Sequence, residues 1–335
     1  MWKYLFFSRC KEGKFVWLAA NSLYLHRIIR LYNLCKMKKA VVYSICVCLF
    51  SWALFGLVWL TVLKNQPSDG IGMQATKVIY MFFPMIVALL MQWGRKEKPS
   101  VTGLLNFKIS WAWTAAVVIP FAALLLAVLI SSLMPGARLH YGPEGVIAFT
   151  GLEGAAADAI RAQFSAIPPV AAITGTLVSG IMAGCTINAV AAFGEEYGWR
   201  NYLVHALQGQ NFWKAALLIG LVWGIWHAPL ILLGHNYPQH PVAGVGMMCV
   251  FCFLLGILEL WLVLKTRSVI PAAMMHGTIN AISGASMFLV QGGTDLTVGM
   301  SGLSGFIAVA IVIAILWLYD RKHDRIMGKE LRIAQ

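Results

Sequence analysis

Long apolar runs separated by short polar connections make up most of the 335-residue chain. A helix needs about 20 apolar residues to cross the ~30 Å hydrocarbon core of a bilayer. The pattern predicts an all-α polytopic membrane bundle of about eight transmembrane helices, at roughly 40–63, 78–93, 112–134, 169–193, 212–234, 242–264, 269–290 and 302–319. The second segment is short, and we expect its helix to begin nearer residue 74.

The polar connections divide the chain into four parts. We interpret 1–36 as a basic N-terminal extension, which is either an interfacial helix or a stretch upstream of a true start at Met37. Residues 37–168 hold the first membrane helices and a long outer connection with one short helix near 154–165. The predicted core is 169–290, and 291–335 holds the last membrane helix and a basic tail.

Composition and charge also indicate a membrane protein. The chain is 59% hydrophobic and 12% charged, whereas a soluble domain carries about a quarter charged residues. Its net charge is +13, but the basic residues gather between apolar segments, which indicates membrane anchoring and not a nucleic-acid partner. The positive-inside rule then places both termini in the cytoplasm. The seven Cys residues, an odd number and mostly within apolar runs, do not predict a disulfide framework.

Polar side chains inside or at the edge of the predicted spans are the main functional signal, because charged groups are costly in a bilayer. They form three groups on separate segments: Glu195, Glu196 and Arg200; His227; and His276 with Asn280. Residues four apart are neighbours on one helix face. This spacing pairs Arg200 with Glu196, leaves Glu195 less compensated, and projects His276 and Asn280 side by side.

These groups permit a hydrolytic site. A poorly compensated carboxylate near a histidine is suited to activating water, so Glu195 and His227 are the candidate water-activating pair. His276 and Asn280 would stabilise the oxyanion that forms when water attacks a carbonyl. Arg200 would hold Glu196 and the end of its helix.

A metal site remains an alternative at this point. Two histidines and a glutamate are a plausible catalytic zinc set, so Glu195, His227 and His276 are candidate ligands of one divalent ion. The sequence has no His-Glu-x-x-His helix. The residues therefore leave open whether hydrolysis needs no cofactor or one metal ion. Glu259, also in an apolar segment, is expected to reach the interface or pair with Lys265.

Three short motifs carry a resemblance to a known family. GEEYGWRNYL resembles the Glu-Glu-x-x-x-Arg motif of the CPBP family of intramembrane proteases, VWGIWHAP is similar to its second motif, and HGTIN matches its His-x-x-x-Asn motif. These CAAX prenyl endopeptidase type II and bacteriocin-processing or self-immunity proteins are also called Abi proteins. The matched core runs from about 170 to 290. Trp223 stands where the family often has Phe, and Asn201 where it often has Gly.

The resemblance implies a fold, an activity and residue roles. It implies a helical membrane fold with a cavity near the cytoplasmic face and endopeptidase activity on a peptide or membrane-protein segment. By resemblance, Glu195 activates water, Glu196 and Arg200 support it, His227 assists, and His276 and Asn280 hold the oxyanion. The family is often labelled metalloprotease, while a metal-free mechanism is also argued for it. The protein would lie in the cell membrane if the organism is bacterial.

Two other functions remain as alternatives. The first is a non-catalytic immunity or scaffold protein of the same family. The second is a transporter with a proton relay, although the sequence shows no repeat halves. For the catalytic interpretation, His227 must reach the depth of Glu195, which requires the helix that carries Glu195 to run on to about residue 206.

Overall fold

The computed structural model describes residues 16–65, 70–97 and 107–332, with side chains described from residue 37 onward. Of the predicted extension 1–36, residues 1–15 lie outside the described residues, and 16–36 form the first part of the helix that continues through residue 58. The chain is mostly helical in these ranges, which confirms the predicted all-α class. The helices of the first half are α1 (Val16–Val58), η1 (Trp59–Leu63), α2 (Ile71–Tyr80), α3 (Phe83–Gly94), α4 (Trp111–Ser131), α5 (Glu144–Thr150) and α6 (Gly154–Ala166).

The second half contains the segments that carry the motifs. Its helices are α7 (Pro169–Cys185), α8 (Ile187–Glu196), η3 (Tyr197–Tyr202), α9 (Leu203–Ala206), α10 (Phe212–Trp226), α11 (Ala228–Leu232), α12 (Pro241–Thr266), α13 (Ile270–Ile282), α14 (Ala285–Leu289) and α15 (Leu303–Lys322). Two short strands, β1 (Arg138–Leu139) and β2 (Val290–Gln291), pair antiparallel.

Fewer helices are long enough to cross a membrane than the eight predicted. Within the described residues, five qualify by length and composition: Met37–Leu63, Ile71–Gly94, Trp111–Ser131, Pro241–Thr266 and Leu303–Lys322. A sixth is added if α6 and α7, which meet at 97°, count as one span. The protein is thus an integral membrane protein of five or six long apolar helices.

Local chemistry explains why the other predicted spans are shorter. The segment 169–193 breaks at Thr186, whose backbone leaves the helical region at φ −126° and ψ −100°. The segment 212–234 is interrupted after Trp226, where Pro229 lacks the N–H of a continuing helix. α13 ends at Ile282, two residues before Gly284. Hydropathy registers none of these breaks because the flanking residues stay apolar.

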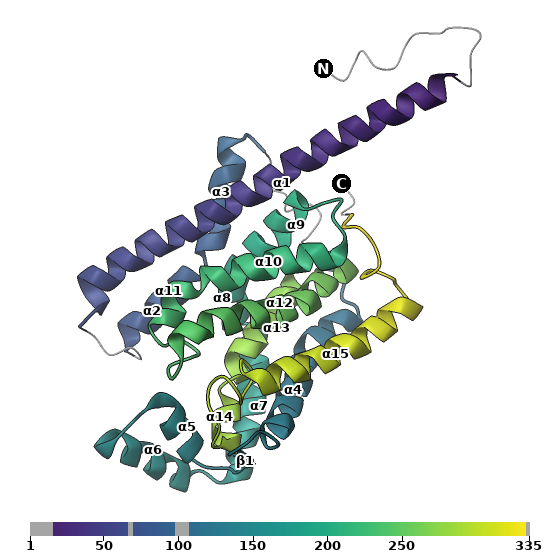
Figure 1. Ribbon diagram of the computed structural model, residues 1–335. Coiled ribbons are helices and arrows are strands. Elements are labelled where there is room, and N and C mark those ends of the chain that lie inside the picture. Colours follow the sequence, from purple (N-terminus) through teal and green to yellow (C-terminus); the bar gives the residue numbers. More distant parts are fainter. Residues whose placement is uncertain (1–15, 66–69, 98–106, 333–335) are drawn as a thin grey trace.

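The helices that carry the motifs lie at the centre of the bundle (Figure 1). α10 and α13 both contact α12, while α8 packs against α13. α1 and α3 cover one side of this group, α4 and α15 cover the other, and α5 and α6 project at one end (Figure 1). α6 confirms the short helix predicted near 154–165.

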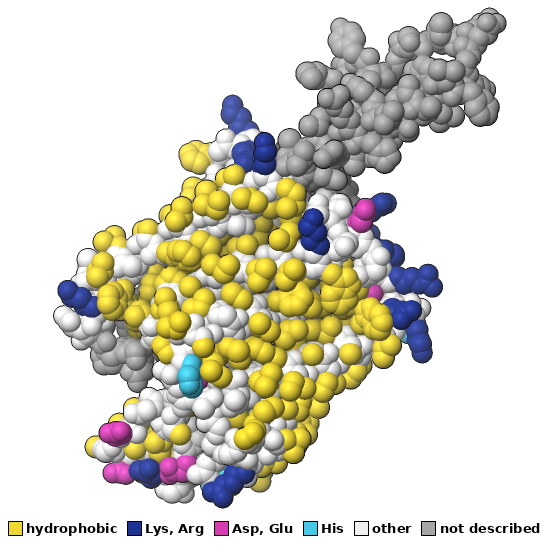
Figure 2. All heavy atoms as spheres, viewed as in Figure 1, with side chains coloured by type: hydrophobic (Ala, Val, Ile, Leu, Met, Phe, Trp, Pro, Cys, Tyr) yellow, Lys and Arg dark blue, Asp and Glu magenta, His cyan; other side chains and the backbone are white. Residues whose placement is uncertain are grey.

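The surface of the bundle fits a lipid environment. Figure 2 shows hydrophobic side chains over the flank of the bundle, whereas Lys, Arg, Asp and Glu side chains gather toward its ends and over the projecting part. Such an apolar band is expected where helices face hydrocarbon. The side of the membrane on which each end lies stays a prediction from the basic connections.

Glycines allow the central helices to approach closely. A Cβ on Gly224 of α10 would lie 2.4 Å from the Cα of Cys249, and a Cβ on Gly220 would lie 2.5 Å from the Cα of Phe253, both on α12. On α13, a Cβ on Gly277 would lie 2.7 Å from the backbone nitrogen of Ala189 in α8. Small residues are the usual means of helix association in membranes.

This packing gives a testable prediction. Gly224→Ala should lower stability by about 1–3 kcal/mol, because the added methyl group meets backbone atoms that cannot move independently. Gly246→Ala, in α12 with no atom within 4 Å of the new Cβ, should be neutral or stabilise by up to about 1 kcal/mol through helix propensity. Thermal or SDS unfolding of the two variants measures the difference. Equal shifts for both variants would contradict close α10–α12 packing.

Candidate functional site

The acidic motif lies where one helical form changes into another. α8 ends at Glu196 and continues without a gap through the π-helical segment η3 into α9, which ends at Ala206. This confirms the expected extension to about residue 206. Short π-helical segments often occur at functional sites, since the wider turn changes the direction of side chains. Here the segment includes Arg200, which points back toward the carboxylates.

Glu195 is held by indole groups. Its side chain is buried, with 2% exposure. Its Oε2 accepts a hydrogen bond from Nε1 of Trp223 at 2.6 Å and a longer one from Nε1 of Trp199 at 3.4 Å. Neither bond is among the predictions from the sequence, although Trp199 follows Glu195 by four residues and Trp223 stands where the family often has Phe. Two neutral donors fix the carboxylate without a counter-charge.

Glu196 connects the first and third motifs. Its Oε1 accepts hydrogen bonds from Arg200 Nη1 at 3.1 Å and from His276 Nδ1 at 3.0 Å. The predicted Glu196–Arg200 pair is therefore confirmed. Because a carboxylate oxygen accepts, the His276 Nδ1 must carry a proton. The remaining ring nitrogen, Nε2, is left for another partner.

Glu259 corrects the sequence analysis. It was expected to reach the interface or pair with Lys265, but it is fully buried and its Oε2 forms an ion pair with Arg200 Nη2. Lys265 pairs instead with Asp324 at 2.6 Å. Six helical residues correspond to about 240° of rotation, so Glu259 and Lys265 project from different faces of α12. An ionisable residue in a membrane helix is a functional candidate by default, so the position of Glu259 in an apolar segment already indicates a role in the site.

Arg200 is thus enclosed by two carboxylates and an aromatic face. Its guanidinium carbon lies 4.2 Å from the ring centroid of Trp223. Arg200, Glu196 and Glu259 are each 0% exposed. Charges in such a place need compensation, and the guanidinium supplies it to both acids. Trp223 therefore contacts both halves of the acidic motif.

His227 lies next to the same tryptophan. Its Nδ1 lies 2.8 Å from the carbonyl oxygen of Trp223 one turn earlier, and because the carbonyl accepts, this nitrogen donates. The ring centroids of Trp223 and His227 are 5.9 Å apart, and those of Trp223 and His276 are 5.2 Å apart. Both histidines are therefore oriented through Nδ1, which leaves each Nε2 available.

One cavity of about 550 Å³ brings the candidate residues together. It is bounded by α2, α10, α12 and α13 and by the loop after α11. Four of the six predicted site residues line it: Glu195, His227, His276 and Asn280. Glu196 and Arg200 are buried and hold His276 and Glu259. The three groups separated in sequence thus converge.

The cavity also contains basic groups that were not predicted. Lys77 of α2 and His235, after α11, both line it. Desolvation by burial, with Lys77 and His227 nearby, lowers the pKa of the His235 imidazole to about 3. His235 is therefore neutral at physiological pH.

A metal ion does not fit the acidic cluster as it is built. Within the described part of the chain, one group of three possible metal ligands has its ligand atoms within 4.8 Å of one another: Glu196, Glu259 and His276. Arg200 pairs with both acids of this group, so a cation is already supplied. The predicted ligands Glu195, His227 and His276 line the cavity together but do not form a second such group.

Comparison with known proteins agrees with the motifs. Residues 177–282, which include all six candidate residues, match the family described as type II CAAX prenyl endopeptidase Rce1-like. The protein named CAAX prenyl protease 2 from Methanococcus maripaludis is 33% identical over 140 residues, which cover 40% of this chain and 48% of that protein. The match thus spans about half the length of this relative. These matches confirm the predicted resemblance to the CPBP proteases.

Proposed function

We propose that the protein is an intramembrane endopeptidase that hydrolyses a peptide bond in a membrane-associated peptide or protein. The observation that carries the proposal is the convergence of Glu195, His227, His276 and Asn280 on one cavity within the membrane bundle. The match to a family of endopeptidases supports it. The protein would lie in the cell membrane if the organism is bacterial, with both termini in the cytoplasm.

The first step is the attack of water on the scissile carbonyl. In the proposal, the Glu195 carboxylate takes one proton from the water while the oxygen bonds to the carbonyl carbon. His227 donates through Nδ1 to the Trp223 carbonyl, so its Nε2 lone pair accepts a hydrogen bond from the water and directs it. The carbonyl π electrons move to oxygen and form the tetrahedral oxyanion.

The second step stabilises and collapses that oxyanion. The Glu196 carboxylate at His276 Nδ1 favours the doubly protonated imidazolium, whose Nε2–H then donates to the oxyanion. The Asn280 amide donates from one turn further along α13. When the carbonyl re-forms, the C–N bond breaks and the proton held by Glu195 passes to the leaving amine. A carboxylic acid and an amine result.

The proposed mechanism uses no metal ion, because the donors of the acidic cluster hold Arg200. The test is mass spectrometry of the purified protein in lipid nanodiscs with a library of apolar peptides in ¹⁸O-labelled water. Each new carboxyl group should gain one ¹⁸O atom, and 1,10-phenanthroline should leave the rate unchanged. Loss of cleavage with the chelator, restored by zinc, would contradict the metal-free part. Absence of cleavage by folded protein would contradict the function.

Trp223 offers a separate prediction. Trp223→Phe removes the indole donor to Glu195 but keeps an aromatic ring beside Arg200. A hydrogen bond to a charged group is worth about 1.5–3 kcal/mol, so the hydrolysis rate should fall roughly 10- to 100-fold. Trp213→Phe, on the partly exposed start of α10, is the matched control and should keep the rate. Equal rates in both variants would show that the Trp223 hydrogen bond does not orient Glu195.

A further inference from the structure

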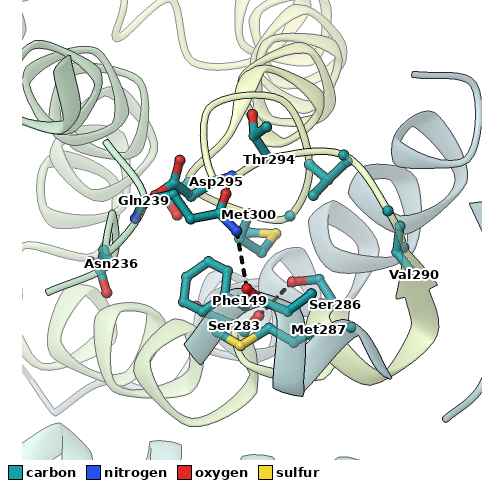
Figure 3. Close-up of a pocket in the computed structure, with 17 residues that line it drawn as sticks. Phe149, Asn236, Gln239, Ser283, Ser286, Met287, Val290, Thr294, Asp295 and Met300 are labelled. Carbon is teal, nitrogen blue, oxygen red and sulfur yellow. Dashed lines mark hydrogen bonds between the residues drawn. The ribbon is translucent and has the colours of Figure 1, made fainter. Parts of the chain in front are cut away.

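A second, smaller cavity shares part of its lining with the first, and its lining residues are drawn in Figure 3. It measures about 80 Å³, which exceeds the ~10–15 Å³ that one water needs. Four residues line both cavities: Asn236, Ser283, Met300 and Ser301. The small cavity is therefore a side pocket of the proposed catalytic cavity, formed by α5, α14 and the loop that follows β2.

The helices give the distance between the pocket and the oxyanion donors. Asn280 lines the large cavity, Ser283 lines both, and Ser286 lines the side pocket. Asn280 on α13 and Ser286 on α14 are six residues apart, and the turn at Ser283 and Gly284 between the two helices keeps right-handed helical backbone angles, so the rise between them is about 9 Å at 1.5 Å per residue. An extended peptide advances about 3.3 Å per residue. A substrate whose carbonyl lies at Asn280 would thus reach the pocket within about three residues of the cleaved bond.

The wall opposite α14 is held in place by a buried carboxylate. Asp295 is 1% exposed; its Oδ1 lies 2.6 Å from His240 Nδ1, and its Oδ2 accepts the backbone N–H of Gln239 at 2.7 Å. The Gln239 side chain donates from Nε2 to the Ala148 carbonyl at 3.1 Å and so joins α5 to the loop between α11 and α12 (Figure 3). The pocket is consequently formed before any ligand binds.

The chemistry of the lining defines what the pocket accepts. Both oxygens of Asp295 already accept hydrogen bonds, from His240 Nδ1 and from the backbone N–H groups of Gln239 and His240. The other lining side chains are uncharged; most are apolar or small, such as Phe149, Met287 and Val298, and two are amides, Asn236 and Gln239. At ~10–15 Å³ per water, the pocket has room for roughly five to eight water-sized atoms, which is one side chain and not a chain segment.

We infer that this pocket is a specificity subsite that receives one uncharged side chain of the substrate, within about three residues of the cleaved bond. The inference rests on the proposed endopeptidase function. A pocket that excludes one extra methylene discriminates about 10- to 200-fold. The substrate class is therefore a membrane-associated peptide with one uncharged side chain of limited size at that position.

Two variants should shift the preference in opposite directions. Ser286→Leu adds side-chain volume from α14 and should shift the preferred substrate side chain toward smaller ones by at least tenfold. Val298→Ala removes side-chain volume from the loop and should shift the preference toward larger ones. Ser286→Ala, which adds no volume, is the control. Ser286 Oγ lies near Gly299, so the larger Leu side chain could prevent folding. In that case Val298→Ala alone tests the size preference.

The experiment uses synthetic apolar decapeptides in which one position at a time carries Gly, Ala, Val, Leu or Phe. Cleavage by the native chain in nanodiscs is measured together with peptide retention by the Glu195→Gln chain, each with and without the pocket variants. A size preference that moves as stated supports the subsite. Cleavage or retention with an unmoved preference overturns the subsite alone. Shifted retention without cleavage overturns the endopeptidase proposal alone, and absence of both overturns the two together.

Discussion

Glu195→Gln is expected to lower the rate of peptide hydrolysis by about 10²- to 10⁴-fold, the usual contribution of a general base. Gln keeps the size of the side chain, and its carbonyl oxygen can still accept the Trp223 indole N–H that Glu195 Oε2 accepts at 2.6 Å. The variant therefore removes the proton acceptor while leaving the cavity wall in place. Initial rates of the purified variant and the native chain on one cleaved peptide give the ratio.

The matched control is Glu153→Gln, an equal change at an exposed position before α6. It should leave the rate unchanged. Equal melting temperatures of the three proteins would separate chemistry from folding. If Glu195→Gln retained more than a tenth of the native rate, Glu195 would not be the general base. A folded native chain without hydrolytic activity would instead support the interpretation as a non-catalytic protein.

Arg200→Met is expected to cause the largest loss of stability. It would leave Glu196 and Glu259 buried at 0% exposure without their cation. Removing one partner of a buried ion pair typically costs about 3–5 kcal/mol, because the other charge stays uncompensated. Unfolding in SDS, followed by tryptophan fluorescence, should show this shift or a loss of folded protein from the membrane.

Arg161→Met is its matched control. Arg161 also pairs with two acids, Glu144 and Asp158, but all three side chains are exposed. Exposed pairs contribute about 0–1 kcal/mol, so this variant should unfold almost as the native chain does. A small effect of Arg200→Met, comparable with that of Arg161→Met, would mean that the buried network does not hold the site together.

Residue spacing predicted the parts of the site that lie on one helix. The four-residue interval correctly paired Glu196 with Arg200, since neighbours on a helix face are fixed by helix geometry. The required depth of His227 correctly predicted a helical continuation to about residue 206. His276 and Asn280, also four apart, line the same cavity. Their chemical roles remain proposals.

Contacts between helices could not be predicted in this way. Glu259 seemed closest to Lys265 along the chain, yet it lies against Arg200 from another helix. The Trp223 indole donor to Glu195 depends on where α10 lies relative to α8, which hydropathy does not encode, whereas Trp199 follows Glu195 by four residues on the same continuous helix. Five or six helices, and not about eight, are long enough to span a membrane by length and composition, because breaks at Thr186 and Pro229 shorten helices without lowering their apolar content.

The central claim is tested most directly by terminal-peptide mass spectrometry of membranes that contain the native chain or Glu195→Gln at equal levels. The source organism is the preferred host, since it supplies the true substrate. New peptide termini should appear only with the native chain, and the residues beside them would give the cleavage sequence. Identical sets of termini in both membranes, with both chains folded, would contradict an endopeptidase that depends on Glu195.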